Sequence, residues 1–110
     1  MTLLQEIDRQ RLENRERRRQ EVRQRLREVL SRTIPGQPVF VFGSLVRPGK
    51  FTDESDIDLA LESEMSEMSI YQFISLLSEQ MGRRVDVILL DECRFSDRIL
   101  KEGELWTPQA

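Results

Sequence analysis

The stretch FGSLVRPGK at residues 42–50, followed by SDIDL at residues 55–59, decides how this chain folds. The β-branched and aromatic residues at positions 39–42 predict a short buried strand that ends in a glycine-serine turn. The apolar run at residues 57–61 predicts a second strand, which an Asp-x-Asp pattern opens. A turn suited to phosphate and a pair of carboxylates suited to a divalent cation are therefore expected on neighbouring elements, a combination that favours nucleotide chemistry.

Length and composition limit the number of domains and the kinds of functional site that are expected. Its 110 residues predict a single domain, 1–110, with a long Arg-rich N-terminal helix at 1–34 and a catalytic core at 38–110. It has no apolar run of membrane-spanning length and no signal-peptide pattern, so we expect a cytoplasmic protein without a membrane partner. The single cysteine, Cys93, excludes an internal disulfide, and the lack of histidine leaves oxygen atoms as the expected metal ligands.

The N-terminal arm differs in charge from the rest of the chain. Residues 1–32 hold ten arginines and six acidic residues, a formal charge of +4, which leaves −7 on the remainder. This region has no Pro or Gly after its start and predicts one long helix. Its middle, residues 13–21, has no apolar side chain, so we expect it to lie in solvent or against a charged partner. Leu3, Leu4 and Ile7 form a distal apolar patch.

Three interpretations of the arm remain open. It is a solvated helix, a contact with another chain or with a second copy through the distal patch, or a nucleic-acid-binding element. The glutamates among the arginines and the scarcity of aromatic residues nearby disfavour nucleic acid.

The remaining elements complete an α/β (α+β) fold. Helical spacing at residues 69–81 opens with a Ser69/Gln72 capping box and stops at Gly82. Residues 84–90 predict a third strand, and residues 96–101 predict a last short helix that ends before Gly103. Trp106 is expected to be a packing residue. This order describes a small mixed sheet flanked by helices.

The acidic residues fit together as one site if the second and third strands are neighbours. Side chains alternate along a strand, so Asp56 and Asp58 are expected on the same side. Asp86 interrupts an otherwise apolar third strand, where an unpaired carboxylate would be costly to bury. The three carboxylates could then bind two metal ions of the kind used in phosphoryl-type transfer.

Each motif also has a plain structural interpretation. Gly43-Ser44 alone is an ordinary turn, and an isolated Asp-x-Asp is often a solvated pair. Asp86 could simply pair with Arg83, with Arg84 or with an arginine of the long helix. The conjunction of all three motifs, in this order and on these elements, favours a nucleotide and metal site.

In these motifs the chain resembles the minimal nucleotidyltransferases of the DNA polymerase beta-like superfamily. The resemblance runs from about residue 39 to the end and rests on Gly43-Ser44, Asp56-x-Asp58 and Asp86. It implies the polymerase-beta-like nucleotidyltransferase fold, ATP as substrate and Mg²⁺ held by the three aspartates, with Asp86 also helping to activate an acceptor hydroxyl. Gly43 and Ser44 would hold the terminal phosphates.

Two departures from the family pattern concern phosphate binding. The spacer between the motifs has eleven residues instead of the usual ten, and Leu45 stands where an arginine is frequent. Arg47 or Lys50 is therefore expected to supply positive charge to the γ-phosphate.

The resemblance also implies a biological role. Similar stand-alone proteins are commonly antitoxins of toxin–antitoxin systems, in which they transfer AMP from ATP to a tyrosine hydroxyl of a HEPN-type ribonuclease toxin (AMPylation). The leading hypothesis is such a protein adenylyltransferase. The alternatives are a non-catalytic binding antitoxin of the same fold, or a nucleotidyltransferase acting on RNA or a small molecule.

Overall fold

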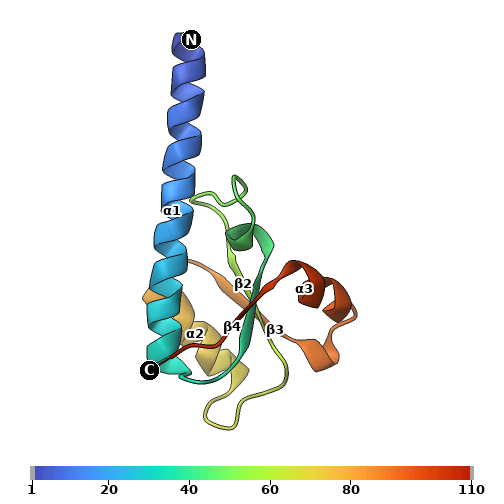
Figure 1. The fold of residues 1–110 in the computed structure, drawn as a ribbon. Helices are drawn as coiled ribbons and strands as arrows, with labels where there is room; N and C mark the ends of the chain where they lie inside the picture. The colour runs from blue at the N-terminus through green and yellow to red at the C-terminus, as the bar shows by residue number, and fades with distance from the viewer. Residues whose placement is uncertain (1, 110) are drawn as a thin grey trace.

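A computed structural model describes residues 2–109 and shows a mixed four-stranded sheet beside one very long helix (Figure 1). The helices are α1 (Leu3–Thr33), α2 (Ile70–Met81) and α3 (Ser96–Glu102). The strands are β1 (Val39–Phe42), β2 (Ile57–Leu61), β3 (Val85–Leu89) and β4 (Glu104–Trp106), and short 3-10 helices cover Gly43–Val46 and Leu90–Glu92. The expected α/β architecture with a small mixed sheet is thus confirmed.

The strands lie in the order β3-β2-β1-β4. β1 is antiparallel to both β2 and β4, whereas β2 and β3 are parallel, as a connection through a helix allows. The first three strands were predicted from their apolar runs. β4 was not, because it has only three residues and its pairing with β1 depends on a partner more than sixty positions away in the sequence.

The two faces of the sheet have different environments. Side chains alternate between the two faces along each strand, and one face packs against α1 and α2. The apolar side chains of this face form the hydrophobic core together with Leu26 and Leu30 of α1 and Phe73 and Leu77 of α2. The opposite face carries the half-buried Phe42, Asp58, Asp86 and Ile88. Among residues 2–109, only the short helix α3 lies over part of this second face, through the buried Ile99, and the rest of the face borders a cavity.

Local sequence signals account for the helix ends. Ser69 caps α2 in a capping box with Gln72, and Gly82 ends it in the left-handed conformation with φ +65°, as predicted. Thr2 and Gln5 form a second capping box at the start of α1. The N-terminal half of α1 extends well beyond the sheet (Figure 1), which makes the molecule 55 Å long but only 28 Å and 21 Å across.

Within residues 2–109, no helix combines the length and the apolar character needed to cross a bilayer.

Candidate active site

Gly43 places the glycine-serine turn directly against an acidic side chain. Its φ is +76°, a backbone conformation that side chains with a Cβ rarely adopt. A Cβ at this position would collide with Oδ2 of Asp58 and lie 3.2 Å from its Cγ. Glycine is therefore required here both for the backbone conformation and for the close approach of β2.

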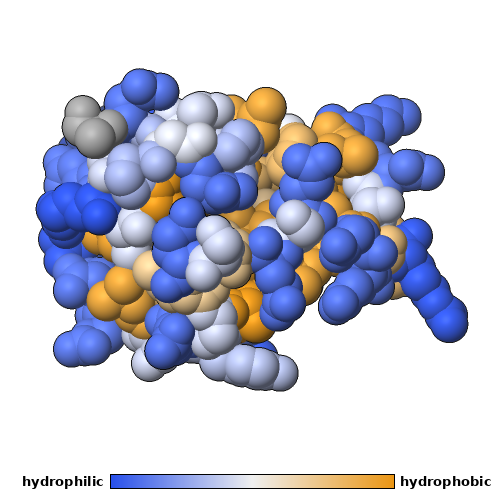
Figure 2. All heavy atoms as spheres, turned by 90° about the horizontal axis from the view of Figure 1, so that it is seen from below, coloured by the Kyte–Doolittle hydropathy of each residue, from blue (hydrophilic) through white to orange (hydrophobic). Residues whose placement is uncertain are grey.

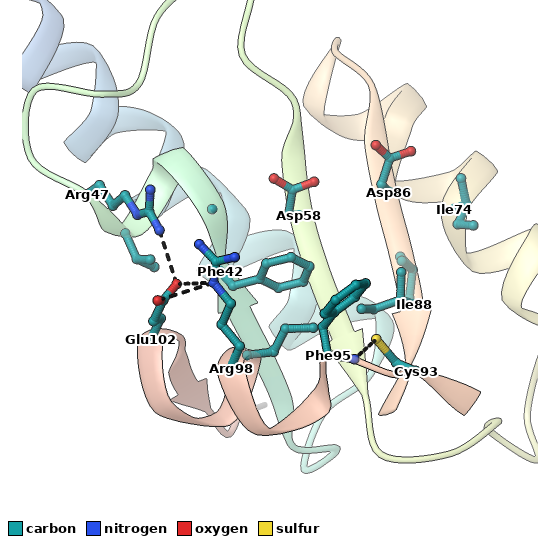
Figure 3. Close-up of a pocket in the computed structure, with 14 residues that line it drawn as sticks. Phe42, Arg47, Asp58, Ile74, Asp86, Ile88, Cys93, Phe95, Arg98 and Glu102 are labelled. Carbon is teal, nitrogen blue, oxygen red and sulfur yellow. Dashed lines mark hydrogen bonds and ion pairs between the residues drawn. The ribbon is translucent and has the colours of Figure 1, made fainter. Parts of the chain in front are cut away.

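Asp58 and Asp86 are neighbours on adjacent strands. The parallel register pairs Asp58 with Asp86, and the antiparallel register pairs Phe42 with Asp58. Figure 3 shows the two carboxylates side by side on β2 and β3, pointing in the same direction from the open face of the sheet. The condition on which the sequence interpretation depended, that the second and third strands are adjacent, is met.

Asp56 precedes β2 and is linked to Asp86 through Arg84. The Nε atom of Arg84 lies 3.1 Å from Oδ1 of Asp86 and 3.9 Å from Oδ2 of Asp56. The guanidinium is largely exposed, and it supplies the positive charge that two adjacent carboxylates need. The pairing of Asp86 with Arg84, given above as the plain structural interpretation, is therefore present.

Burial and neighbouring charges perturb the ionisation of Asp58. Partial burial, and then the negative charges of Asp86 and Asp56, raise the pKa of Asp58 from 3.8 to about 6, with a smaller opposing effect of Arg84. A carboxyl group of raised pKa in a cavity is typical of a functional site, because a structural ion pair would normally lower it.

A cavity of about 720 Å³ opens beside these carboxylates. Gly43, Arg47, Asp58 and Asp86 line it together with apolar side chains of β1, β3 and α3. Arg47 is held by Glu102, whose Oε2 lies 3.1 Å from its Nη2, and Arg98 also contacts Glu102 at 3.3 Å. The cavity thus has an acidic wall, an arginine-bearing wall and an apolar floor, and its size suits a nucleotide.

Not all of the predicted site residues reach this cavity. Ser44 lies in the 3-10 helix next to Gly43 but does not line the cavity, and Lys50 is exposed in the turn at 48–50. Asp56 also lies outside the lining. The structure therefore gathers Gly43, Arg47, Asp58 and Asp86, and leaves Ser44, Lys50 and Asp56 at its margin.

Arginines of α1 hold the turn in place, a role that the sequence analysis missed. Arg19 is buried and donates from Nη1 to the carbonyl oxygen of Leu45 at 2.8 Å, while Glu16 binds its other nitrogens. Arg23 makes a two-pronged contact with Glu104 at 2.8 and 3.0 Å, and Arg27 lies 4.6 Å over the ring of Trp106. Residues 13–21 were expected in solvent or against a charged partner, and the structure shows Arg19 buried against Glu16 and the carbonyl oxygen of Leu45. The signal was available, since Arg19 is in helical spacing with Val22 and Leu26.

The longer spacer is anchored at its far end. Phe51 is fully buried, and the Arg83 guanidinium lies 4.6 Å from its ring. Arg83 also donates to the carbonyl oxygens of Thr52 and Ser55 at 3.3 and 2.9 Å. These contacts fix Phe51, Thr52 and Ser55 directly ahead of Asp56 and β2.

The donor set is compatible with a hard divalent cation. Asp58 and Asp86 offer adjacent carboxylate oxygens next to a backbone turn without a Cβ, and Mg²⁺ binds such oxygens. Within residues 2–109, no group of three acidic or thiol side chains converges tightly enough to hold a metal ion in this arrangement. Metal binding by all three aspartates would therefore require Arg84 to move and Asp56 to approach.

Comparison with known proteins places the chain in a family. The family model described as polymerase beta nucleotidyltransferase matches residues 24–107. The chain therefore belongs to the polymerase beta nucleotidyltransferase family, whose members generally use a nucleotide and Mg²⁺.

A solved structure supports the same fold. The chain is similar to one in the crystal structure of a toxin–antitoxin with AMP-PNP, with a TM-score of 0.58 and 22% sequence identity. The alignment covers 78% of this chain and 73% of the other. No curated protein matches the chain.

Proposed function

We propose that this protein is a Mg²⁺-dependent nucleotidyltransferase that transfers AMP from ATP to a hydroxyl group of a partner protein. The observation that carries the proposal is the packing of Gly43 against Asp58, with Asp86 in register beside it. In this arrangement, a backbone turn that a ligand can approach closely lies next to two carboxylates, and both line a cavity of a size that suits a nucleotide. Family membership independently supports the reaction class.

Each site residue has a role in this reaction. Gly43, which has no side chain, lets the nucleotide phosphates approach the backbone next to Ser44. Arg47 and Lys50 move toward the bound triphosphate and supply positive charge to it. Asp58 and Asp86 would hold Mg²⁺ with Asp56. The bound metal would neutralise charge that develops on the phosphate oxygens.

The transfer step follows from these positions. The acceptor hydroxyl oxygen forms a bond to the α-phosphorus, the bond from this phosphorus to the α–β bridging oxygen breaks, and pyrophosphate leaves. Asp86 accepts the hydroxyl proton and passes it to solvent. The product is an adenylylated acceptor, and no oxidant or reductant is needed.

The partner that we propose is a toxin, specifically a HEPN-type ribonuclease with an acceptor tyrosine. One observation supports a protein partner, since the chain with a similar fold belongs to a structure of a toxin–antitoxin with AMP-PNP. An antitoxin of this kind would silence its toxin by covalent modification.

A second candidate is a binding antitoxin without catalysis. The contacts of Arg84 with Asp86 and Asp56 favour it, because a guanidinium that permanently neutralised both carboxylates would exclude metal. Incubation with labelled ATP, Mg²⁺ and the co-purifying partner separates the candidates. Transfer of label supports the enzyme, whereas a partner silenced without label supports the binding protein.

A further inference from the structure

A second hollow continues from the active-site cavity along β3 and α2. It has a volume of about 540 Å³ and shares five lining residues with the first cavity, namely Ile74, Val87, Ile88, Cys93 and Phe95. Figure 3 shows Ile88, Phe95 and Cys93 next to the strands that bear Asp58 and Asp86. The two hollows therefore form one continuous trough that leads from the carboxylates to Tyr71 on α2.

The trough is apolar, and aromatic side chains stand exposed along it. Phe95 is 69% exposed at the junction of the two hollows, and Tyr71 is 80% exposed at the distal end. Figure 2 shows hydrophobic side chains reaching the surface among charged ones on the face seen from below. Exposed aromatic residues beside an apolar hollow are typical of a surface that binds protein.

The charges around the trough favour a basic ligand over a polyanion. Glu64 and Glu92 line its distal part and outnumber Arg94, the single basic residue there. At the near end, Asp58, Asp86 and Glu102 are accompanied by two arginines, Arg47 and Arg98. A nucleic-acid strand in the distal part would bring phosphates toward Glu64 and Glu92, whereas lysine or arginine side chains would complement these carboxylates.

The backbone of β3 offers a further means of recognition. β3 is at the edge of the sheet, so among the described residues its outer N–H and C=O groups face no neighbouring strand. Such an edge can pair with an extended peptide segment while apolar pockets on either side accept its side chains.

We propose that the distal part of this trough, beside Tyr71, Glu92 and Phe95, is the acceptor subsite, where an apolar and aromatic polypeptide segment with basic flanks lies along β3 and presents its hydroxyl toward Asp58 and Asp86. The inference rests on the proposed AMP transfer to a protein. It adds the chemical class of the acceptor and the surface that selects it. Tyr71, Phe95 and Glu92 are the specificity-determining residues of this subsite.

Peptide binding to the full chain, without ATP, tests the subsite separately from catalysis. The probe is a fluorescent peptide with a central tyrosine flanked by leucines and lysines. A second peptide carries glutamates in place of the lysines, and an oligoribonucleotide serves as a third probe. The test variant combines Tyr71→Ala with Glu92→Lys. The control variant combines Leu105→Ala with Glu79→Lys, which removes an exposed apolar side chain and reverses an exposed charge away from the trough.

We expect the basic peptide to bind best and the test variant to weaken it about tenfold, as loss of a buried aromatic anchor at an interface commonly does. The control variant should bind it like the unmodified chain. Equal binding by test and control variants, or stronger binding of the oligoribonucleotide, would overturn the subsite.

Transfer to free tyrosine amide distinguishes failure of the subsite from failure of the proposed function. This small acceptor does not need the distal trough, so the unmodified chain should label it whether or not a peptide binds there. Label on tyrosine amide together with unselective peptide binding overturns the subsite alone. Selective peptide binding with no label on any acceptor supports the trough as a docking surface and overturns the transfer reaction.

Discussion

Gly43 and Asp58 are packed so closely that no Cβ fits between them, even though fourteen residues separate them in the sequence. The contact joins the turn after β1 to the first acidic strand position, and the pairing of β2 with β3 adds Asp86. Two motifs that are each common in turns and loops thereby become one site. This contact is the most direct structural reason to treat them as a unit.

Replacement of Gly43 by alanine should disrupt both the turn and the carboxylate. The new methyl group adds a steric conflict with Asp58 to the strain of a positive φ, and we expect a loss of about 2 kcal/mol in the free energy of unfolding, along with loss of activity. Gly82→Ala is the matched control, since Gly82 also has a positive φ but its Cβ would meet no atom within 4 Å. Chemical denaturation of both variants measures the difference. Equal destabilisation would show that the contact with Asp58 is unimportant.

The stability of the metal-free chain should depend on the ionisation of Asp58. Its folded-state pKa of about 6 lies above its usual value, so the folded state resists ionisation more than the unfolded state does. The contribution of Asp58 to the free energy of unfolding is therefore fully present below about pH 4, and it is lost as the pH rises through the folded-state pKa of about 6.

Asp58→Asn removes this dependence. Because solvent screens a half-buried group, we expect the variant to be stabilised by about 1 kcal/mol or less at pH 7, with little difference at pH 4. Thermal unfolding at the two pH values, without divalent ions, tests the effect. A variant less stable than the unmodified chain at pH 7 would contradict the assigned direction of the pKa shift.

Arg84 should compete with a metal ion for the carboxylates. Its guanidinium contacts Asp86 and Asp56, so Arg84→Gln removes a competing positive charge, and we expect Mg²⁺ to bind several-fold more tightly. Calorimetric titration with Mg²⁺ measures the affinity, and Arg32→Gln in the last turn of α1 serves as a control for the loss of one positive charge. If Arg84→Gln bound Mg²⁺ more weakly than the unmodified chain while Arg32→Gln did not, Arg84 would support metal binding instead of competing with it.

Arg19 should be a structural residue although it lies in an arginine-rich helix. Arg19→Met leaves the Leu45 carbonyl and Glu16 without their buried partner, and we expect a loss of about 2 kcal/mol in the free energy of unfolding. Arg17→Met, at an exposed position of the same helix, should change it by less than about 0.5 kcal/mol. Urea denaturation compares the two variants. Similar small effects would show that the contact between Arg19 and the turn contributes little.

Most of the fold was predictable because its elements carry strong local signals. Residues 39–42 and 57–61 are short apolar runs next to turns, and α2 has both a capping box and a terminal glycine. β4 carries no such signal, because three residues with one exposed leucine acquire strand structure only through β1.

The site was predictable in its residue types but not in its details. Asp58 and Asp86 follow from strand periodicity once β2 and β3 are adjacent. The contacts of Arg84 and the anchoring of Leu45 by Arg19 depend on long side chains that can reach many partners, and sequence spacing does not choose among them. The roles of the candidate site residues in binding phosphate or metal stay predictions, and of the four expected to bind phosphate only Gly43 and Arg47 line the cavity.

The most direct test of adenylyl transfer uses ATP labelled either at the α-phosphate or at the γ-phosphate, with Mg²⁺ and the co-purifying partner. We expect that only the α-label becomes covalently attached to the partner, that chelation of Mg²⁺ prevents this attachment, and that Asp58→Asn and Asp86→Asn each abolish it. Attachment of the γ-label, or unchanged attachment by both variants, would contradict an adenylyl transfer site built on Asp58 and Asp86.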